Sequence, residues 1–239
     1  MILSDEGIRK ALASGELKID PAPADDQYTT SSVDLTLGSV FQVWDKSRLD
    51  VPGVRVELDL ADQKFAQTSD AYIVSADVDA NGCCILPPYH KEPRLLLAIT
   101  RERIHLVPGS RLAARVEGRS SFARLGLVVH LTAPTIQHGF RGTITLEILN
   151  HGPFYVKFVP TRTRICQLIF ERLETDPTGE IETQFQDQIS PSGGSRLSQE
   201  KAYELSRKKP DSAGRNRKQN RRKPRRRRKF PGGPERKRK

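Results

Sequence analysis

Short strand-like runs separated by turn residues constrain the fold of this chain most strongly. Between residues 33 and 171, β-branched and other apolar residues recur in short alternating runs, which are broken by VPG, NG, LPP, VPGS, QHGFRG and NHGP. A period of two is typical of half-buried strands. Because helical patterns do not separate the runs, the sequence predicts an all-β fold, a distorted barrel or jelly-roll-like sandwich. We expect strands at 33–37, 40–44, 54–58, 71–76, 94–99, 111–116, 127–131, 143–149, 154–159 and 164–171.

The N-terminal segment LSDEGIRKALASGEL has the pattern of a short helix that precedes the strands. Ser4 is a suitable N-cap, Ile8 and Leu12 share one helical face, and Gly15 is a suitable terminator. The sequence therefore predicts one helix between Ser4 and Gly15.

The composition changes towards the C-terminus. Apolar density falls after Leu173, and beyond Ser206 the only large apolar side chain is Phe230. A segment with so little apolar surface cannot offset the entropy lost on ordering. We therefore expect three parts: a β-barrel domain (1–173), a mobile arm with one short helix at its end (174–206) and a disordered tail (207–239).

Charge is divided unevenly along the chain. Residues 207–239 hold 18 Lys and Arg and two acidic residues, a balance of +16, which leaves −5 on residues 1–206 out of a net +11. Runs such as RRKPRRRRK favour contact with nucleic-acid phosphates but carry no base-reading information. The alternative is a solubilising extension.

Composition also excludes several classes of protein. The sequence has no run of 18 or more apolar residues, so we expect no segment to span a membrane. The acidic N-terminus MILSDEGIRK does not resemble a secretory signal. Cys83, Cys84 and Cys166 suit neither a disulfide framework nor a zinc site, which favours a reducing cytoplasm. The H-x-E and P-C-x-x-C signature of zinc deaminases is absent. No histidine has metal-ligand spacing to a carboxylate, so we propose no protein-held metal.

The stretch VEGRSSFARLGLVVH (116–130) has two interpretations. In the structural one, Ser120 or Ser121 caps a short helix, Arg124 faces solvent and the following apolar residues, Leu125 included, are buried. In the functional one, the glycine and hydroxyls form an anion site to which Arg119 adds a bidentate fork.

A second candidate region follows in HLTAPTIQHGFRG (130–142) and TITLEILN (143–150). Alternation sets Thr143, Thr145 and Glu147 on one strand face, where Glu147 either meets water or acts as a base in a cleft. His130 fits a core or rim position better than a catalytic one. Phe140 either stacks on a ligand ring or plugs the barrel.

Taken in order, GRSSFARLG, HLTA and GFRGTITLE, with SSVDLTLG near the N-terminus and RICQLIFERL after them, resemble the dCTP deaminase branch of the dUTP pyrophosphatase-like superfamily. The resemblance covers residues 1–197 and is dense over 107–173. It implies a homotrimer of distorted β-barrels, with each active site built between subunits. It also implies a deoxynucleoside triphosphate bound with Mg²⁺, the ion being held through the phosphates.

The resemblance also implies a role for each matching residue. Arg119, Ser120 and Ser121 would hold phosphate oxygens, with Ser120 also positioning the water, and Arg124 would orient the catalytic group. The remaining roles fall on Thr132 and Ala133 (backbone reading of the pyrimidine), Phe140 (packing on the deoxyribose), Gln188 (closing over the phosphates) and Glu147 (general base).

Two departures concern the site itself. Gln137 stands where the family usually has Asp; an amide can bond a 3′-hydroxyl but cannot act as a base. Gln184 and Phe185 stand where the family has Lys and Tyr, which weakens the expected grip on the triphosphate.

The resemblance implies hydrolytic deamination of dCTP to dUTP and ammonia, in the supply of dUMP and dTTP. One alternative is a bifunctional enzyme that also removes pyrophosphate and forms dUMP, against which Gln137 counts. The other is a catalytically weak nucleotide-binding regulator with a nucleic-acid-binding tail.

Overall fold

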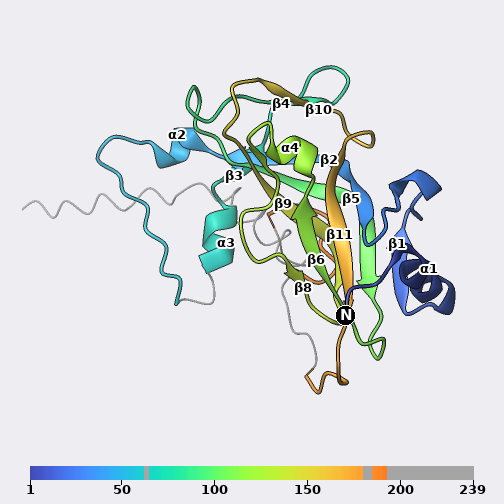
Figure 1. Ribbon diagram of the computed structural model, residues 1–239. Helices are drawn as coiled ribbons and strands as arrows, with labels where there is room; N and C mark the ends of the chain where they lie inside the picture. Colours follow the sequence, from blue (N-terminus) through green and yellow to red (C-terminus); the bar gives the residue numbers. More distant parts are fainter. Residues whose placement is uncertain (62–64, 180–184, 193–239) are drawn as a thin grey trace, which may run out of the picture. The chain divides into compact units, whose positions relative to one another are not determined.

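Antiparallel strands make up most of the regular structure, as the sequence predicts. The computed structural model describes residues 1–61, 65–179 and 185–192. Within them, nine strands form one antiparallel sheet (Figure 1). Its main path runs β7 (Leu127–Val128), β9 (Arg141–Asn150), β5 (Leu96–Leu106), β2 (Val33–Trp44), β11 (Arg164–Arg172), β6 (Leu112–Gly118) and β8 (Thr135–Ile136). β1 (Leu17–Asp20) pairs with β5, β3 (Ile73–Ser75) pairs with β2, and β4 (Cys84–Leu86) pairs separately with β10 (Val156–Phe158).

The predicted N-terminal helix is confirmed as α1 (Asp5–Ser14). The Ser4 hydroxyl accepts a hydrogen bond from the Gly7 N–H, and Gly15 ends the helix in the left-handed conformation (φ +79°). The other helical elements are short: α2 (Lys46–Leu49), α3 (Phe65–Asp70), α4 (Ser120–Ala123) and the 3₁₀ turn η1 (Asp25–Gln27).

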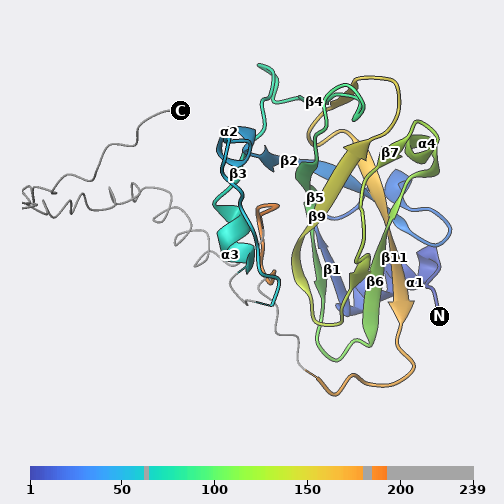
Figure 2. The ribbon, with the colours of Figure 1, turned by 90° about the vertical axis from the view of Figure 1, so that its left-hand side faces the viewer.

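The sheet curls because the short segment 127–136 supplies the strands at both ends of the sheet path, β7 and β8. β7 pairs with β9 at one end of the sheet path, and β8 pairs with β6 at the other. Seven residue steps separate Val128 from Thr135, and an extended chain spans at most about 24 Å over that distance. A flat sheet of this path would be about 29 Å wide, since neighbouring strands lie ~4.8 Å apart. The strands therefore curve towards each other, forming the rounded sheet of Figure 2.

The concave side of this sheet holds the hydrophobic core. Alternate residues of the long strands point into it, among them the fully buried Leu35, Leu146 and Phe170, and α1 adds Ile8. This core fixes the strands on which the candidate site is built.

Several predicted strand boundaries are wrong. Residues 54–58 form no strand: Val54 and Leu58 are exposed, and Arg55 pairs with Glu57. β-Branched residues favour strands only where a neighbouring strand gives them a surface to pack on. The expected break between 37 and 40 is also wrong, because β2 continues through Gly38. A Cβ there would lie 3.0 Å from the Ile99 carbonyl oxygen, so this glycine allows close approach of β5.

The pattern also missed β1, β4, β8, α2 and α3, which are short. The predicted short helix of the arm and the disordered tail lie outside the described residues, as does Gln184. None of the helices in the described ranges has the length and apolar character needed to cross a membrane.

Candidate active site

A cavity of about 530 Å³ lies where the segment between β7 and β8 passes β9. Its lining comes from that segment, from β8 and the turn after it, from β5 and β9, and from residues 185–191 of the arm. The lining residues are Leu97, His130, Thr132, Ala133, Thr135, Ile136, Gln137, Phe140, Ile144, Thr145, Glu147, Phe185, Gln188 and Pro191.

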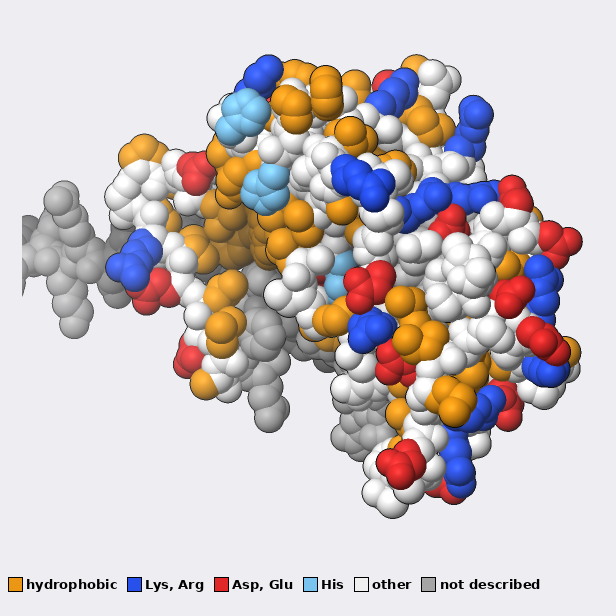
Figure 3. Space-filling model, in the orientation of Figure 1, with side chains coloured by type: hydrophobic (Ala, Val, Ile, Leu, Met, Phe, Trp, Pro, Cys, Tyr) orange, Lys and Arg blue, Asp and Glu red, His pale blue; other side chains and the backbone are white. Residues whose placement is uncertain are grey.

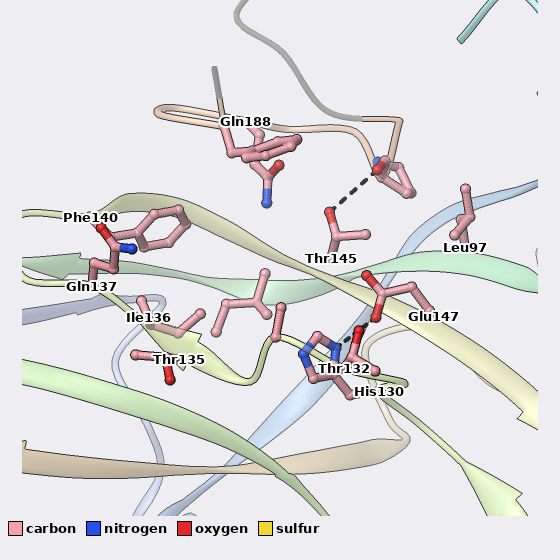
Figure 4. Close-up of a pocket in the computed structure, with 14 residues that line it drawn as sticks. Leu97, His130, Thr132, Thr135, Ile136, Gln137, Phe140, Thr145, Glu147 and Gln188 are labelled. Carbon is pink, nitrogen blue, oxygen red and sulfur yellow. Dashed lines mark hydrogen bonds and ion pairs between the residues drawn. The ribbon is translucent and has the colours of Figure 1, made fainter. Parts of the chain in front are cut away.

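Six residues that the sequence analysis selected line this one cavity: Thr132, Ala133, Gln137, Phe140, Glu147 and Gln188. Figure 4 shows Gln137 and Phe140 at one end of the cavity and Glu147 at the other, with Gln188 above them. The cavity thus has an aromatic ring and an amide at one end and its carboxylate at the other.

Strand geometry aims Glu147 into the cavity. In β9 the side chains of Ile144, Leu146 and Ile148 are buried, whereas Thr145 and Glu147 are partly exposed, as the alternation predicts. The Glu147 side chain is 29% exposed. A carboxylate so placed is shielded from bulk water yet open to a ligand.

His130 is a site residue that the sequence analysis undervalued. Its Nδ1 lies 2.7 Å from Oε2 of Glu147, and its side chain is 12% exposed. Neither ring nitrogen, nor that oxygen, has a partner among the described residues that meets the angular requirement of a hydrogen bond. We therefore describe the contact as an ion pair, and proximity to Glu147 raises the pKa of His130. The sequence did contain a signal for His130: both His130 and Glu147 lie on segments that resemble the site of one family.

The backbone around Thr132 is shaped for the cavity. Ala133 has a φ of +59°, in the left-handed region that residues other than glycine rarely adopt. Such strain is often found at functional sites, because the surrounding structure must hold it. Here it turns the chain beside Glu147 between the strands β7 and β8.

The arm packs over the cavity through polar contacts. The buried Gln188 donates its side-chain amide to the Thr143 carbonyl (2.7 Å), and the Thr143 hydroxyl donates to the Gln188 carbonyl (2.9 Å). Asp187 forms ion pairs with Arg103 and Arg141, which lower the pKa of its carboxyl group. These contacts hold residues 185–192 at the cavity.

The residues of the predicted phosphate motif lie elsewhere: Arg119, Ser120, Ser121 and Arg124 do not line this cavity. They form α4 and its two flanks, after β6. The predicted serine cap is wrong, because the N-cap position is Arg119 and no side chain caps the helix. Leu125, which the structural interpretation buries, is 50% exposed.

Two glycines hold the end of α4 against the loop after β9. The His151 N–H donates to the Gly126 carbonyl (2.8 Å), and Gly126 has a φ of +82°. A Cβ on Gly152 would lie 1.9 Å from the Leu125 carbonyl oxygen. Only glycine permits this backbone contact, which sets the position of the motif residues.

No group of three potential metal ligands occurs among residues whose placement is described. The three cysteines are buried and free. Burial raises the pKa of the Cys84 thiol to about 11 and raises that of Cys166 further. Both thiols are therefore protonated at neutral pH and unsuited to nucleophilic chemistry.

Comparisons with known proteins point to one family. The family model described as dCTP deaminase-like matches residues 2–173. A dCTP deaminase of Rhodospirillum rubrum is 38% identical over 198 residues, which cover 80% of this chain and 94% of that protein. A dUMP-forming dCTP deaminase of Methanobrevibacter smithii is 39% identical over 174 residues, covering 73% and 81%.

A solved structure shares the fold. The structure of 2′-deoxycytidine 5′-triphosphate deaminase from Agrobacterium tumefaciens superposes with a TM-score of 0.50 and 23% identity. The match covers 71% of this chain and 47% of that one, so this chain spans about half of its length. The family model and the two relatives show that this chain belongs to the dCTP deaminase-like family.

Proposed function

We propose that this protein deaminates dCTP to dUTP and ammonia. The observation that carries the proposal is Glu147, the one carboxylate among the described residues that line the cavity. A carboxylate there can take a proton from water, whose oxygen attacks C4 of cytosine. The proton then passes to the exocyclic nitrogen, the C4–N bond breaks, and ammonia leaves.

The other cavity residues fit the nucleoside. Phe140 offers an apolar face to the deoxyribose, and the Gln137 amide can bond its 3′-hydroxyl. The backbone of Thr132 and Ala133 lies on the side of Glu147, where the pyrimidine edge would be read. Gln188 has a buried side-chain oxygen with no partner within the described ranges, and this oxygen is available to a ligand donor.

The phosphate motif supports a site shared between subunits. Arg119, Ser120, Ser121 and Arg124 are absent from the cavity of their own chain. We propose that they meet the cavity of a neighbouring copy in a homotrimer, so that Arg124 and Ser120 reach the water at Glu147.

An apolar patch beside these residues is suited to such a contact. Leu125, Phe154 and Tyr155 are exposed, and hydrophobic side chains gather at the top of the molecule in Figure 3, near β4 and β10. We propose that a second copy of the chain covers this patch.

We propose that the reaction proceeds without zinc, because Glu147 can carry the proton transfer and the sequence lacks the zinc-deaminase signature. We propose that Mg²⁺ arrives on the triphosphate and keeps water and phosphate oxygens as its ligands. Its contribution is to neutralise phosphate charge. Proton transfer remains with Glu147.

Formation of dUMP is the second candidate, favoured by relatives whose names include it. Gln137 counts against it, because an amide cannot activate a second water.

The test is ammonia release from dCTP, CTP, dCMP and dUTP with Mg²⁺, with chromatography of the nucleotides. We expect dCTP alone to yield dUTP, and Glu147→Gln to lower the rate at least about a hundredfold, as removal of a general base does. The matched control is Glu117→Gln, a half-exposed carboxylate paired with Arg115 on β6. If Glu147→Gln retains ammonia release, the mechanism is wrong. If dCTP binds without turnover in the wild type, the protein is a nucleotide-binding regulator.

We also propose that the basic tail binds nucleic acid non-specifically. The full chain should bind DNA with a steep salt dependence, which truncation after Ser206 removes. Unchanged binding after truncation would refute this role.

A further inference from the structure

Arg119 is held by a buried carboxylate that the proposed mechanism does not use. Asp34 lies on β2, and its side chain is 6% exposed. Its Oδ2 lies 3.3 Å from a terminal nitrogen of Arg119. Asp34 belongs to the SSVDLTLG segment, far from Arg119 in sequence.

Three neighbouring strands bring the two residues together. β6 ends at Gly118, next to Arg119, and pairs with β11, which pairs in turn with β2 (Figure 1). Gln167 on β11 is the register partner of Asp34. Its side-chain amide donates to Asp34 Oδ1 at 3.1 Å, so the carboxylate is fixed on both of its oxygens.

The remaining surroundings fix the plane of the guanidinium. Arg119 donates from its other terminal nitrogen to the Arg164 carbonyl (3.1 Å), and its charged carbon lies 5.6 Å from the ring centre of Phe122. The side chain is still 31% exposed. Of the five N–H donors of the guanidinium, one is used by the Arg164 carbonyl, while Asp34 is held as an ion pair. The other donors remain for an anion.

Charge alone does not explain this arrangement. A carboxylate beside an arginine reduces its net attraction for phosphate, so Asp34 would weaken binding if only charge mattered. A guanidinium whose plane is set in advance loses less conformational entropy when it bonds phosphate in a bidentate manner. Asp34 is useful to the site only if orientation outweighs charge.

We propose that Asp34 is a positioning residue that aims Arg119 at the triphosphate of the substrate. The inference rests on the proposed function only in taking Arg119 as a phosphate ligand. Asp34 touches no reacting atom, and it acts through Arg119 alone.

The experiment is a double-mutant cycle on the full chain, measuring Kd for dCTP and for deoxycytidine by calorimetry with Mg²⁺. Asp34→Asn should weaken dCTP binding about tenfold, the effect of one misplaced charge-assisted hydrogen bond, and leave deoxycytidine binding unchanged. In an Arg119→Gln background, in which the guanidinium that Asp34 would position is absent, the second change should alter Kd less than twofold. KM should rise while kcat changes little.

Glu102→Gln is the matched control. Glu102 is equally buried but accepts from the Thr36 N–H and the Gln27 amide and does not contact Arg119. It should leave the Kd for dCTP within twofold. If Asp34→Asn does not fold, Gln167→Met loosens the same carboxylate and should raise the Kd about threefold, again only when Arg119 is present.

Tighter binding by Asp34→Asn, or equal weakening with and without Arg119, overturns the inference. Ammonia release by the wild type, measured separately, tests the proposed function. If coupling of Asp34 to Arg119 occurs without deamination, the proposed function fails and the inference stands. If deamination occurs without coupling, the inference alone fails.

Discussion

Replacement of Gly152 by Ala tests how the loop after β9 holds the phosphate motif. The new Cβ would lie 1.9 Å from the Leu125 carbonyl oxygen and 3.1 Å from the carbonyl carbon. Ordinary carbon contacts are about 3.5–4.0 Å, so the backbone must move by roughly 1.5 Å. Neither neighbour is a flexible side chain that could turn away.

The cost follows from the atoms involved. Overpacking costs about 1–3 kcal/mol, and a backbone neighbour favours the upper end of that range. Separation of the two loops also loses the hydrogen bond from the His151 N–H to the Gly126 carbonyl, worth about 1 kcal/mol. We expect Gly152→Ala to lower the free energy of unfolding by about 3–4 kcal/mol, or Tm by roughly 10 °C for a domain of this size.

The assay is thermal unfolding at equal protomer concentration, because assembly shifts Tm. Gly53→Ala is the control: Gly53 has a φ of +75°, but nothing lies within 4 Å of a Cβ there. It should cost only the left-handed strain, about 1–2 kcal/mol. At a temperature where both variants are folded, Gly152→Ala should also raise KM for dCTP, since Arg119 is the N-cap residue of α4.

If Gly152→Ala lowers Tm no more than Gly53→Ala does, the backbone contact between Gly152 and Leu125 is not the source of the destabilisation. An unchanged KM in a destabilised Gly152→Ala protein would refute the narrower claim that this contact sets the position of α4.

Three further predictions concern charged groups. Pairing with Glu147 raises the pKa of His130, so this pairing stabilises the fold fully below the unfolded pKa of about 6.5 and is lost as the pH rises through the folded pKa. The difference in Tm between the wild type and His130→Gln should therefore shrink from pH 6 to pH 9. A constant difference would contradict the pairing. Burial raises the pKa of Asp70 from 3.8 to about 6, so this carboxyl group destabilises the fold increasingly as the pH rises from 3.8 to about 6, and fully above that. Asp70→Asn should therefore raise Tm at pH 7.5 and change it little below pH 3.8, and an equal rise at both pH values would contradict the burial. Asp187→Asn should raise KM for dCTP up to about fivefold at low salt and less at high salt, because the ion pairs of Asp187 with Arg103 and Arg141 are partly exposed and are screened by salt. An unchanged KM at low salt would show that these ion pairs do not hold the arm.

The fold was predictable where periodicity and tertiary context agree. The alternation of TITLEIL gave the two faces of β9 correctly from Ile144 to Ile148, whereas Thr143 is buried because Gln188 covers it. Ser4 and Gly15 set the ends of α1. Residues 54–58 also contain β-branched residues, but no strand in the described parts of the chain pairs with them. Pairing partners are a property of the folded chain, which no local pattern contains.

The cavity was predictable as a set of residues but not as an arrangement. Thr132, Phe140 and Glu147 lie together as their motif order suggests, whereas the pairing of His130 with Glu147 depends on the turn at Ala133. That turn needs a left-handed alanine, which local propensity argues against.

The distribution of ionisable groups in the cavity bears on which product can form. Deamination occurs at the cytosine ring, whereas dUMP formation breaks a phosphoanhydride at the other end of the nucleotide and needs its own activated water. Among the lining residues that the structure describes, the ionisable side chains are Glu147 and His130, and they pair with each other. At the far end, Gln137 stands beside Phe140 and cannot accept a proton at neutral pH. If this chain forms dUMP, the second base must therefore come from another copy of the chain or from residues beyond those described.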